Sequence, residues 1–479
     1  MKEKSLTKNY IYNLTLTSIN IIFPLITSPY LSYILGVENI GKVNYSTSII
    51  NWFILFSSFG IPRYGIREIA RKRESKKELN ITFWNLIIIQ FIFTIISSVV
   101  YIILVLNSSL INDWKLYFIM LFMLVLNIFS IDWFYQGIEE YEYITKRNIC
   151  IKVLSLILIF LMVRNRDNYL IYASINVFAM CFNNVLNYLH AKEYINIKIF
   201  KNRIYFYLKE LRLYFFTTLI VASYNQLDQV MIGTLSEKDL AYYLRSKMVL
   251  SVGINITNSI VTVLVPRVSY LIEKNYNEYN LILQDSLNYI YILALPCTAG
   301  IYMLSEQLMV LLGGNEFLPA AGSLRIISII IPIASIGNWQ INQILLSHRQ
   351  EKISFIIQFI ASLFSIIVNI ILIPKLFYIG AAITWVLTEI LLVLMEHIAI
   401  KRYCNGINIK YLNESFLKYL VATVLMILEI YILKNYFHSN IIIIIVSILL
   451  GSITYFVILF LTKEKILLQI LKKYKLIKV

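Results

Sequence analysis

The sequence is poor in the residue types that most often build catalytic and metal sites. Its 479 residues include only four cysteines and four histidines. The cysteines stand singly and form no CxxC pair, so they indicate neither a metal site nor a disulfide framework and are expected to serve packing. The histidines occupy unrelated places. We therefore expect no catalytic residue, no metal and no cofactor, and we expect that the protein is not an enzyme.

Charge is also scarce, since 15% of the residues are charged and 59% are hydrophobic. The mean hydropathy of +0.71 exceeds what a soluble chain of this length could cover. Apolar runs of about 20 residues recur, which is the length that a bilayer core of ~30 Å requires. The first run starts near Tyr10, is too long for a signal peptide and predicts an uncleaved span. The fold class expected is an all-α polytopic membrane protein.

Hydropathy, interrupted by glycine, proline and charge clusters, predicts fourteen transmembrane helices. The connections between them are short, which leaves no room for a soluble catalytic domain and argues against a membrane glycosyltransferase. The predicted spans are 10–35, 42–62, 81–106, 115–137, 149–163, 169–190, 212–235, 245–268, 286–312, 322–347, 353–374, 378–400, 416–434 and 440–462.

The net charge of +16 reflects membrane topology rather than nucleic-acid binding. With the N-terminus in the cytoplasm, 33 of the 43 Lys and Arg residues fall in cytoplasmic segments and 10 in external ones. This bias follows the positive-inside rule. It predicts that both termini are cytoplasmic and that the number of spans is even.

The two halves of the chain repeat one another. Three pairs of segments match in order, at offsets of 197, 204 and 207 residues, and each pair is six spans apart. An even number of spans makes the repeats parallel, a build in which transporters bind substrate between the halves. Chance similarity in a biased sequence is the alternative. The pairs are "YILGVENIGKVNYS" (33–46) with "MIGTLSEKDLAYYLRS" (231–246), "GIPRYGI" (60–66) with "LVPRVSY" (264–270), and "QGIEEYEYITKRN" (136–148) with "QILLSHRQEKIS" (343–354).

This repeat predicts three parts of the chain. Residues 1–205 form an N-terminal six-helix lobe and residues 206–405 a second six-helix lobe. Residues 406–479 form an additional helix pair with a basic tail.

Several segments resemble the polysaccharide transporter family, the repeat-unit flippases for O-antigen and capsule, within the multidrug/oligosaccharidyl-lipid/polysaccharide exporter superfamily. The resemblance implies two lobes around a cavity that opens alternately to either side. It also implies a substrate, an undecaprenyl-pyrophosphate-linked oligosaccharide. The segments are "PLITSPYLSYILGVENIGKVNYSTSIINWFILFSSFGIPRYGIREIA" (24–70), "DWFYQGIEEYEYITKRN" (132–148), "QLDQVMIG" (226–233) and "PKLFYIGAAITWVLTE" (374–389).

Cationic side chains at span ends are candidates for binding the pyrophosphate. Arg63 and Arg67 are four residues apart, hence on one helical face, just past Pro62 at the predicted cytoplasmic end of a span. Arg267 is the repeat equivalent of Arg63. Positive-inside anchoring is the alternative role for all three.

Three further cations lie near the predicted outer face, against the topological bias. Arg245 and Lys247 enter one span, and either contact the cavity or extend to the interface. Arg325 lies early in another span, where Glu316 is a possible ion-pair partner.

Acidic residues inside spans are costly and usually face a cavity or a partner. We expect Asp228 to pair with Arg245 or Lys247; the alternative is a protonatable site beside a phosphate-binding cation. Glu389 is a second candidate for coupling or ion pairing, and Glu396 follows it seven residues later on one face.

Amides inside spans, among them Asn183, Asn187 and Gln340, are candidates for hydrogen bonds to sugar hydroxyls. Interhelical hydrogen bonding is the commoner role of such amides. Prolines within spans predict kinks that alternating access could use as hinges. They are Pro24, Pro29, Pro296 and Pro332.

The expected function is a flippase of the bacterial inner membrane that moves the lipid-linked oligosaccharide from the cytoplasmic to the outer leaflet. Its partners would be this glycan, membrane lipids and other glycan-assembly membrane proteins, without nucleic acid. A cation-coupled multidrug antiporter of the same superfamily is the first alternative, and a membrane polysaccharide polymerase or ligase is the second.

Overall fold

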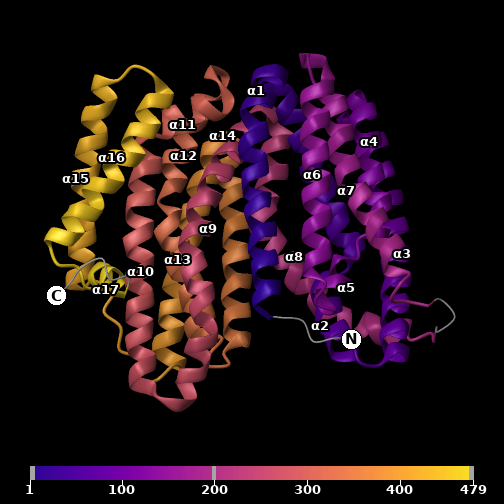
Figure 1. Cartoon of the computed structure of the whole chain (residues 1–479). Coiled ribbons are helices and arrows are strands. Elements are labelled where there is room, and N and C mark those ends of the chain that lie inside the picture. Colours follow the sequence, from indigo (N-terminus) through magenta and orange to yellow (C-terminus); the bar gives the residue numbers. More distant parts are fainter. Residues whose placement is uncertain (1–5, 197–200, 474–479) are drawn as a thin grey trace. The chain divides into compact units, whose positions relative to one another are not determined.

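The computed structural model describes residues 6–196 and 201–473, and every regular element in these ranges is a helix (Figure 1). The chain divides into two compact units, Met1–Lys238 and Asp239–Val479. The all-α polytopic fold predicted from the sequence is thereby confirmed.

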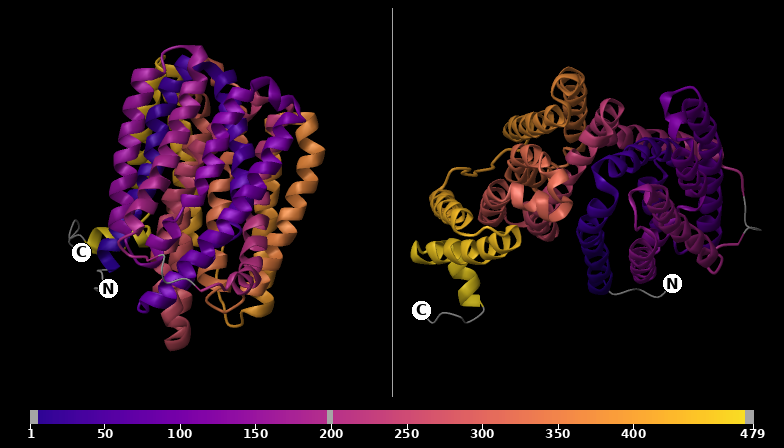
Figure 2. Two further views of the ribbon diagram at one scale, coloured as in Figure 1. Left: turned by 90° about the vertical axis from the view of Figure 1, so that its right-hand side faces the viewer. Right: turned by 90° about the horizontal axis from the view of Figure 1, so that it is seen from above.

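Within unit 1 the long helices run side by side along one direction (Figures 1 and 2). Helix α1 packs against α3 and α6, and α4 packs against α7. The elements of unit 1 are α1 (Leu6–Ser58), α2 (Ile61–Lys72), α3 (Lys76–Leu106), η1 (Ser109–Asp113), α4 (Trp114–Val125), η2 (Leu126–Phe129), α5 (Asp132–Gly137), α6 (Tyr141–Met162), η3 (Arg166–Asn168), α7 (Tyr169–Ala191) and α8 (Ile204–Leu235).

Unit 2 is built in the same way, and its last long helices, α15 and α16, pack closely against each other (Figure 1). Its elements are α9, which begins at the unit boundary (Glu237–Lys274), α10 (Tyr276–Met303), α11 (Ser305–Gly313), η4 (Asn315–Phe317), α12 (Ala320–Ser328), α13 (Ile330–Trp339), η5 (Gln340–Leu345), α14 (Glu351–Tyr403), α15 (Glu414–Tyr436), α16 (Asn440–Leu461) and α17 (Lys465–Lys473).

Two helical elements of 53 residues each cover two predicted spans. The backbone leaves the helical region at Gly36 in α1 (φ 73°, ψ 171°) and at Phe377 in α14 (φ 49°, ψ −129°). Beyond Phe377 the chain turns back on itself. The turn brings Gly380 so close to Leu372 that a Cβ on Gly380 would lie 2.5 Å from the carbonyl oxygen of Leu372.

The described residues contain nine helices long and apolar enough to cross a membrane, or ten if the bent pair of α12 with α13 and η5 counts as one span. Part of the difference from fourteen arises because α1 and α14 each count once here and cover two predicted spans. The exact number of crossings stays a prediction.

Helix α8 packs within unit 1, against α1, α2 and α3. Gly233 of α8 leaves no room for a Cβ, which would lie 2.2 Å from the ring of Tyr45 in α1. The compact units therefore divide after Lys238, whereas the repeat predicted a first lobe ending at residue 205. The predicted division at residues 205 and 405 follows the sequence repeat, whereas the two compact units follow the packing of the helices. The three-part division therefore stays a prediction.

The exposed surface of the long helices is apolar. On α3 the side chains of Phe91, Ile95, Ile96 and Val99 are all exposed. A continuous apolar face of this kind fits contact with lipid rather than water.

Candidate functional site

Helix α2 is a short amphipathic helix that begins directly after Gly60, whose φ of 76° turns the chain. Its buried face carries Ile61, Tyr64, Glu68 and Ile69, at the three- and four-residue spacing of one helical side. Arg63, Arg67 and Arg71 recur every four residues and are exposed or largely so. The helix thus presents a basic stripe on the side opposite its core contacts.

Two glycines hold α2 in this rotation. A Cβ on Gly65 would lie 2.5 Å from the indole of Trp133, so α2 rests directly on that ring. A Cβ on Gly137 would lie 2.7 Å from Ile69. Around them α2, α3, α5 and α8 share one buried cluster that includes Phe83, Trp133 and Tyr207.

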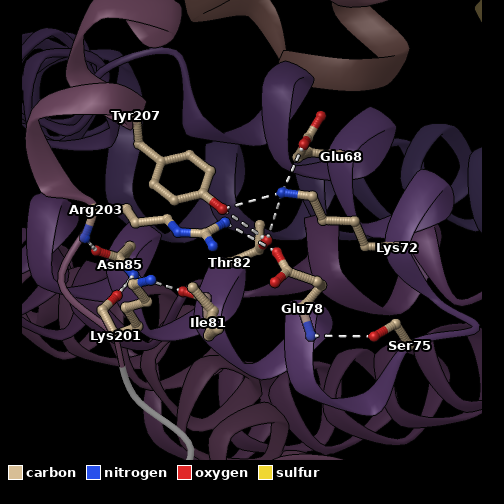
Figure 3. Close-up of polar contacts among 10 residues, drawn as sticks. All are labelled: Glu68, Lys72, Ser75, Glu78, Ile81, Thr82, Asn85, Lys201, Arg203 and Tyr207. Atoms are coloured by element: carbon tan, nitrogen blue, oxygen red, sulfur yellow. Dashed lines mark hydrogen bonds and ion pairs between the residues drawn. The ribbon is translucent and has the colours of Figure 1, made fainter.

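Lys72, at the end of α2, binds side chains within unit 1. Lys72 Nζ lies 2.8 Å from the buried carboxylate of Glu68 and donates to Thr82 Oγ1 and Tyr207 Oη, both at 3.1 Å (Figure 3). Thr82 and Tyr207 are themselves 2.9 Å apart. This closed network fastens α2 to α3 and α8.

The two candidate arginines have different surroundings. Among the described residues Arg63 makes no hydrogen bond or ion pair, and Arg67 lies over the rings of Tyr64 and Tyr214 at 5.7 and 5.2 Å. Their neighbours Arg71 and Arg73 instead face the carboxylates of Glu68 and Glu139. Arg63 and Arg67 are therefore available to an anion, which is what phosphate capture requires.

The segment after α7, residues 192–203, is here called strap 1, and side chains of α3 hold its described ends. The N–H of Asn196 donates to Asn80 Oδ1, and Trp84 Nε1 donates to the Asn196 carbonyl at 3.3 Å. Asn85 accepts from the N–H of Arg203 at 2.7 Å and donates to the carbonyl of Lys201 at 2.8 Å (Figure 3).

The segment after α14, residues 404–413 or strap 2, is held in the same way by α10. Asn280 Oδ1 accepts from the N–H of Asn408 at 3.2 Å. Gln284 pairs with both backbone groups of Lys410, accepting at 2.9 Å and donating at 3.1 Å. Tyr276 donates to the carbonyl of Asn405 at 2.5 Å.

The sequence carries a signal for these clamps that the repeat comparison missed. "SKKELN" (75–80) and "NYNEYN" (275–280) each join a helix N-cap, a glutamate three residues on and the clamping asparagine. "INIK" occurs at 195–198 and again at 407–410, with its asparagine bonded by Asn80 or Asn280. Hydropathy alone marks these polar segments only as connections between spans.

Two of the cations in unit 2 already have acidic partners. Arg267 pairs with Glu278 at 3.1 Å. Arg325 pairs with Glu306 and donates to Ser305 Oγ at 2.9 Å. Glu306 begins the neighbouring helix α11, and the pairing of Arg325 with Glu316 stays a prediction.

Arg245 and Lys247 lie among aromatic rings at the start of α9. Arg245 is buried, lies over Phe317 at 4.6 Å and donates to the carbonyl of Leu312 at 2.6 Å. Lys247 Nζ lies over Tyr243 and Trp385 at 5.1 and 4.6 Å. Ring faces of this kind attract cations.

The two candidate acids lie in different units. Asp228, in α8, is buried and accepts from the N–H of Gln229 at 2.9 Å. Glu389, in α14, accepts from the indole of Trp385 at 3.1 Å. Because Asp228 belongs to unit 1 and the expected cations to unit 2, their ion pair stays a prediction.

The amides proposed for sugar contact form local bonds. Asn187 is fully buried and donates to Asp132 Oδ1 at 2.5 Å, and Asn183 donates to the carbonyl of Ala179 at 2.8 Å. Gln340 is also fully buried, 3.0 Å from Tyr411 Oη. These are the interhelical and intrahelical bonds of the commoner alternative, and the sugar role stays a prediction. Among the described residues, no group of three or more His, Cys, Asp or Glu side chains could hold a metal ion.

Known proteins resemble this chain in sequence. A family described as polysaccharide biosynthesis protein matches residues 6–272, and the family MatE matches residues 214–371. A "Putative O-antigen transporter" of Escherichia coli (strain K12) is 25% identical over 168 residues, which are 34% of this chain and 40% of that protein. The chain thus matches less than half the length of this relative.

Solved structures share the fold. A lipid II flippase, MurJ, in an inward closed conformation has a TM-score of 0.71 at 18% identity and covers 94% of this chain and 98% of its own. An inward-facing multidrug resistance transporter of the MATE family has a TM-score of 0.61 at 14% identity over 83% and 99%.

The transporter fold of the two units, the basic face of α2 and the match over residues 6–272 agree with the resemblance in the sequence. Since that match covers more than half of its length, the chain belongs to the polysaccharide biosynthesis protein family.

Proposed function

We propose that the protein is a flippase that moves undecaprenyl-pyrophosphate-linked oligosaccharide repeat units from the cytoplasmic to the outer leaflet by alternating access. The observation that carries this proposal is the basic face of α2, where Arg63 and Arg67 are exposed and unpaired with any acid of the described chain. A pyrophosphate leaving water needs charge-assisted hydrogen bonds, which guanidinium groups supply in bidentate form.

The chain is a multi-pass membrane protein, and the proposal places it in the bacterial inner membrane with both termini in the cytoplasm. Membership of the polysaccharide biosynthesis family and the name of the E. coli relative support a glycan as the cargo. Transport of this kind involves no covalent chemistry. Other glycan-assembly membrane proteins would be its partners, acting before and after translocation.

The alternative is a cation-coupled multidrug antiporter, which the match of MatE to residues 214–371 favours. Such a protein would present carboxylates rather than arginines to its substrate. A polysaccharide polymerase or ligase is a weaker alternative, because the connections of the described chain hold no sizeable domain.

Complementation of bacterial strains that lack defined repeat-unit flippases tests the proposal, with surface glycan as the readout. We expect the wild-type chain to restore glycan in at least one such strain. The double variants Arg63→Ala/Arg67→Ala and Arg63→Ala/Arg267→Ala should fail to restore it while inserting normally. Arg71→Ala/Arg73→Ala removes the same charge from the same segment, but from side chains that already face carboxylates, and should restore it.

Normal glycan with Arg63→Ala/Arg67→Ala would refute the role of the α2 face. Resistance to cationic drugs without any glycan restoration would favour the antiporter.

A further inference from the structure

A groove in unit 1 lies where strap 1 leaves α7 and meets α3. It encloses about 560 Å³. Its walls combine two lysines, three aromatic rings and one acid from parts of the chain that are far apart in the sequence. These side chains are Lys76 and Trp84 of α3, Tyr188 of α7, and Lys192, Glu193 and Tyr194 of strap 1.

The groove lies next to the apolar surface of unit 1. Leu189, the neighbour of Tyr188 on α7, is exposed, and so is Phe91 of α3. Phe91 follows Trp84 by seven residues, a rise of about 10 Å along the helix. Tryptophan, tyrosine and lysine beside an apolar surface are typical of the head-group level of a bilayer. In the predicted topology this end of α3 faces the cytoplasmic leaflet.

Two of the rings are fixed by hydrogen bonds. Trp84 Nε1 donates to the carbonyl of Asn196 at 3.3 Å, and Tyr194 Oη donates to Glu140 Oε1 at 3.0 Å. The aromatic walls therefore hold their positions without a ligand. A ligand that binds there does not have to order them, which lowers the entropic cost of binding.

The two lysines are the groups that could still bind an anion. Both are exposed, and among the described residues neither side chain makes an ion pair or a hydrogen bond. Lys192 Nζ lies over the ring of Tyr188, at 6.0 Å from its centroid. The exposed carboxylate of Glu193 lies 3.8 Å from Nε2 of His190. Two cations and one carboxylate, Lys76, Lys192 and Glu193, leave one net positive charge in the groove, which matches a singly charged phosphodiester.

We propose that this groove binds the head group of an anionic glycerophospholipid of the cytoplasmic leaflet. The phosphate binds Lys76 and Lys192, and the acyl chains extend over the exposed apolar side chains beyond Trp84. Basic pockets between helices at this level are where anionic lipids bind membrane proteins. The bound lipid joins the ends of α3 and α7 to strap 1 and so stabilises unit 1. The site does not depend on the proposed cargo, because no arginine of α2 is among its described lining residues.

Native mass spectrometry of the full chain, stripped of lipid in detergent and mixed with phosphatidylglycerol, tests the site. We expect the wild type to bind one lipid tightly. Lys76→Ala/Lys192→Ala should bind it roughly 25-fold more weakly, at about fivefold for each lysine. The matched control Lys77→Ala/Lys201→Ala removes two exposed lysines from the same α3 end and the same strap, outside the groove, and should bind as the wild type does. Equal affinity in the two double variants would overturn the proposal.

Thermal unfolding separates this effect from misfolding and identifies the source of the phosphate. Without lipid, both double variants should unfold at the wild-type Tm. Added phosphatidylglycerol should raise the Tm of the wild type and the control more than that of Lys76→Ala/Lys192→Ala. An equal rise with phosphatidylethanolamine would refute the preference for an anionic lipid. An equal rise with inorganic phosphate would refute the lipid and indicate a soluble anion.

The rim acid gives a second test with the opposite sign. Glu193→Gln removes a carboxylate that repels an anionic head group, so it should tighten phosphatidylglycerol binding in the same mass-spectrometric assay. Weaker binding would mean that Glu193 holds a cationic or hydroxylated part of the head group, and it would overturn the charge argument for this site.

Discussion

Straps 1 and 2 are each held by an asparagine, Asn80 or Asn280, that occupies the same place in its motif but has different surroundings. In unit 1 the clamping side chains of α3, Asn80 and Asn85, are fully buried, whereas Asn280 and Gln284 of α10 are half-buried. The glutamates that precede the asparagines also differ in partner. Glu78 pairs with Arg203 of strap 1, and Glu278 pairs with Arg267.

This difference explains why the two halves do not present equal charge. In unit 1 the carboxylate of Glu78 forms an ion pair with Arg203, and Arg63 has no acidic partner among the described residues. In unit 2 no described arginine of strap 2 forms an ion pair with Glu278. Glu278 pairs instead with Arg267, the predicted repeat equivalent of Arg63. The two positions that the predicted repeat makes equivalent thus carry one open cation and one neutralised cation, and the following changes test that comparison.

The largest effect is expected from Asn85→Leu. It would remove the two part-buried hydrogen bonds that Asn85 makes with the N–H of Arg203 and the carbonyl of Lys201, at about 0.5–1.5 kcal/mol for each bond. Thermal unfolding of the purified protein in detergent should show a clear drop in Tm. Asn107→Leu, at the exposed end of the same helix, is the control and should change little. Equal Tm values for the two variants would show that strap 1 is not held at Asn85.

Arg63→Ala should account for most of the export lost in the Arg63→Ala/Arg267→Ala double variant. A charge-assisted hydrogen bond is worth about 1.5–3 kcal/mol, or roughly 10–160-fold in transport rate. Arg267→Ala alone should lower surface glycan far less, because its guanidinium is already paired. Equal losses from the two single variants would contradict the asymmetry.

Gln284→Leu should destabilise unit 2 less than Asn85→Leu destabilises unit 1. The two bonds to Lys410 are exposed, so water can replace them, and about 0.5–1.5 kcal/mol in total is expected. The same unfolding assay compares the two. A larger effect at Gln284 would reverse the proposed order of the clamps.

Glu278→Gln should barely affect stability, since exposed ion pairs contribute about 0–1 kcal/mol. By releasing Arg267 it should partly restore the glycan export lost in Arg63→Ala. Surface glycan measured in Arg63→Ala with and without Glu278→Gln checks this. No recovery would mean that charge at the second position cannot substitute for the first.

The smallest effect concerns the pH dependence of strap 1. Burial and the neighbouring Glu140 carboxylate raise the pKa of Tyr194 to about 12. Folding thus favours the neutral phenol, whose contribution is complete below the ordinary tyrosine pKa of about 10 and is lost as the pH rises toward 12. Tyr194→Phe should therefore lose less stability than the wild type over that range, measured as Tm against pH. Identical pH profiles would show that Tyr194 does not titrate as a fixed part of the strap.

The sequence predicted the helical membrane fold and the family, because long apolar runs and the family segments are local signals. It also picked out the arginines of α2, since their four-residue spacing survives in any helix. It could not show which cation is neutralised. Arg203 and Glu78 are 125 residues apart, and their pairing depends on how strap 1 returns to α3.

The break at Phe377 falls between the predicted spans 353–374 and 378–400, but its form was not predictable, since a non-glycine residue with positive φ leaves no mark in composition. The contact of Gln340 with Tyr411 depends on the path of strap 2, which hydropathy treats as a plain polar connection.

The contact between Gly65 and Trp133 has a consequence for how α2 can vary. The helix lies so close to the indole of Trp133 that there is room only for a hydrogen at Gly65, and this close contact fixes the rotation of α2 about its axis. Adding one methyl group there would push or turn the helix, and with it the direction of every arginine on its outer face. The orientation of the charged surface is thus specified by a position that carries no charge and never meets the cargo.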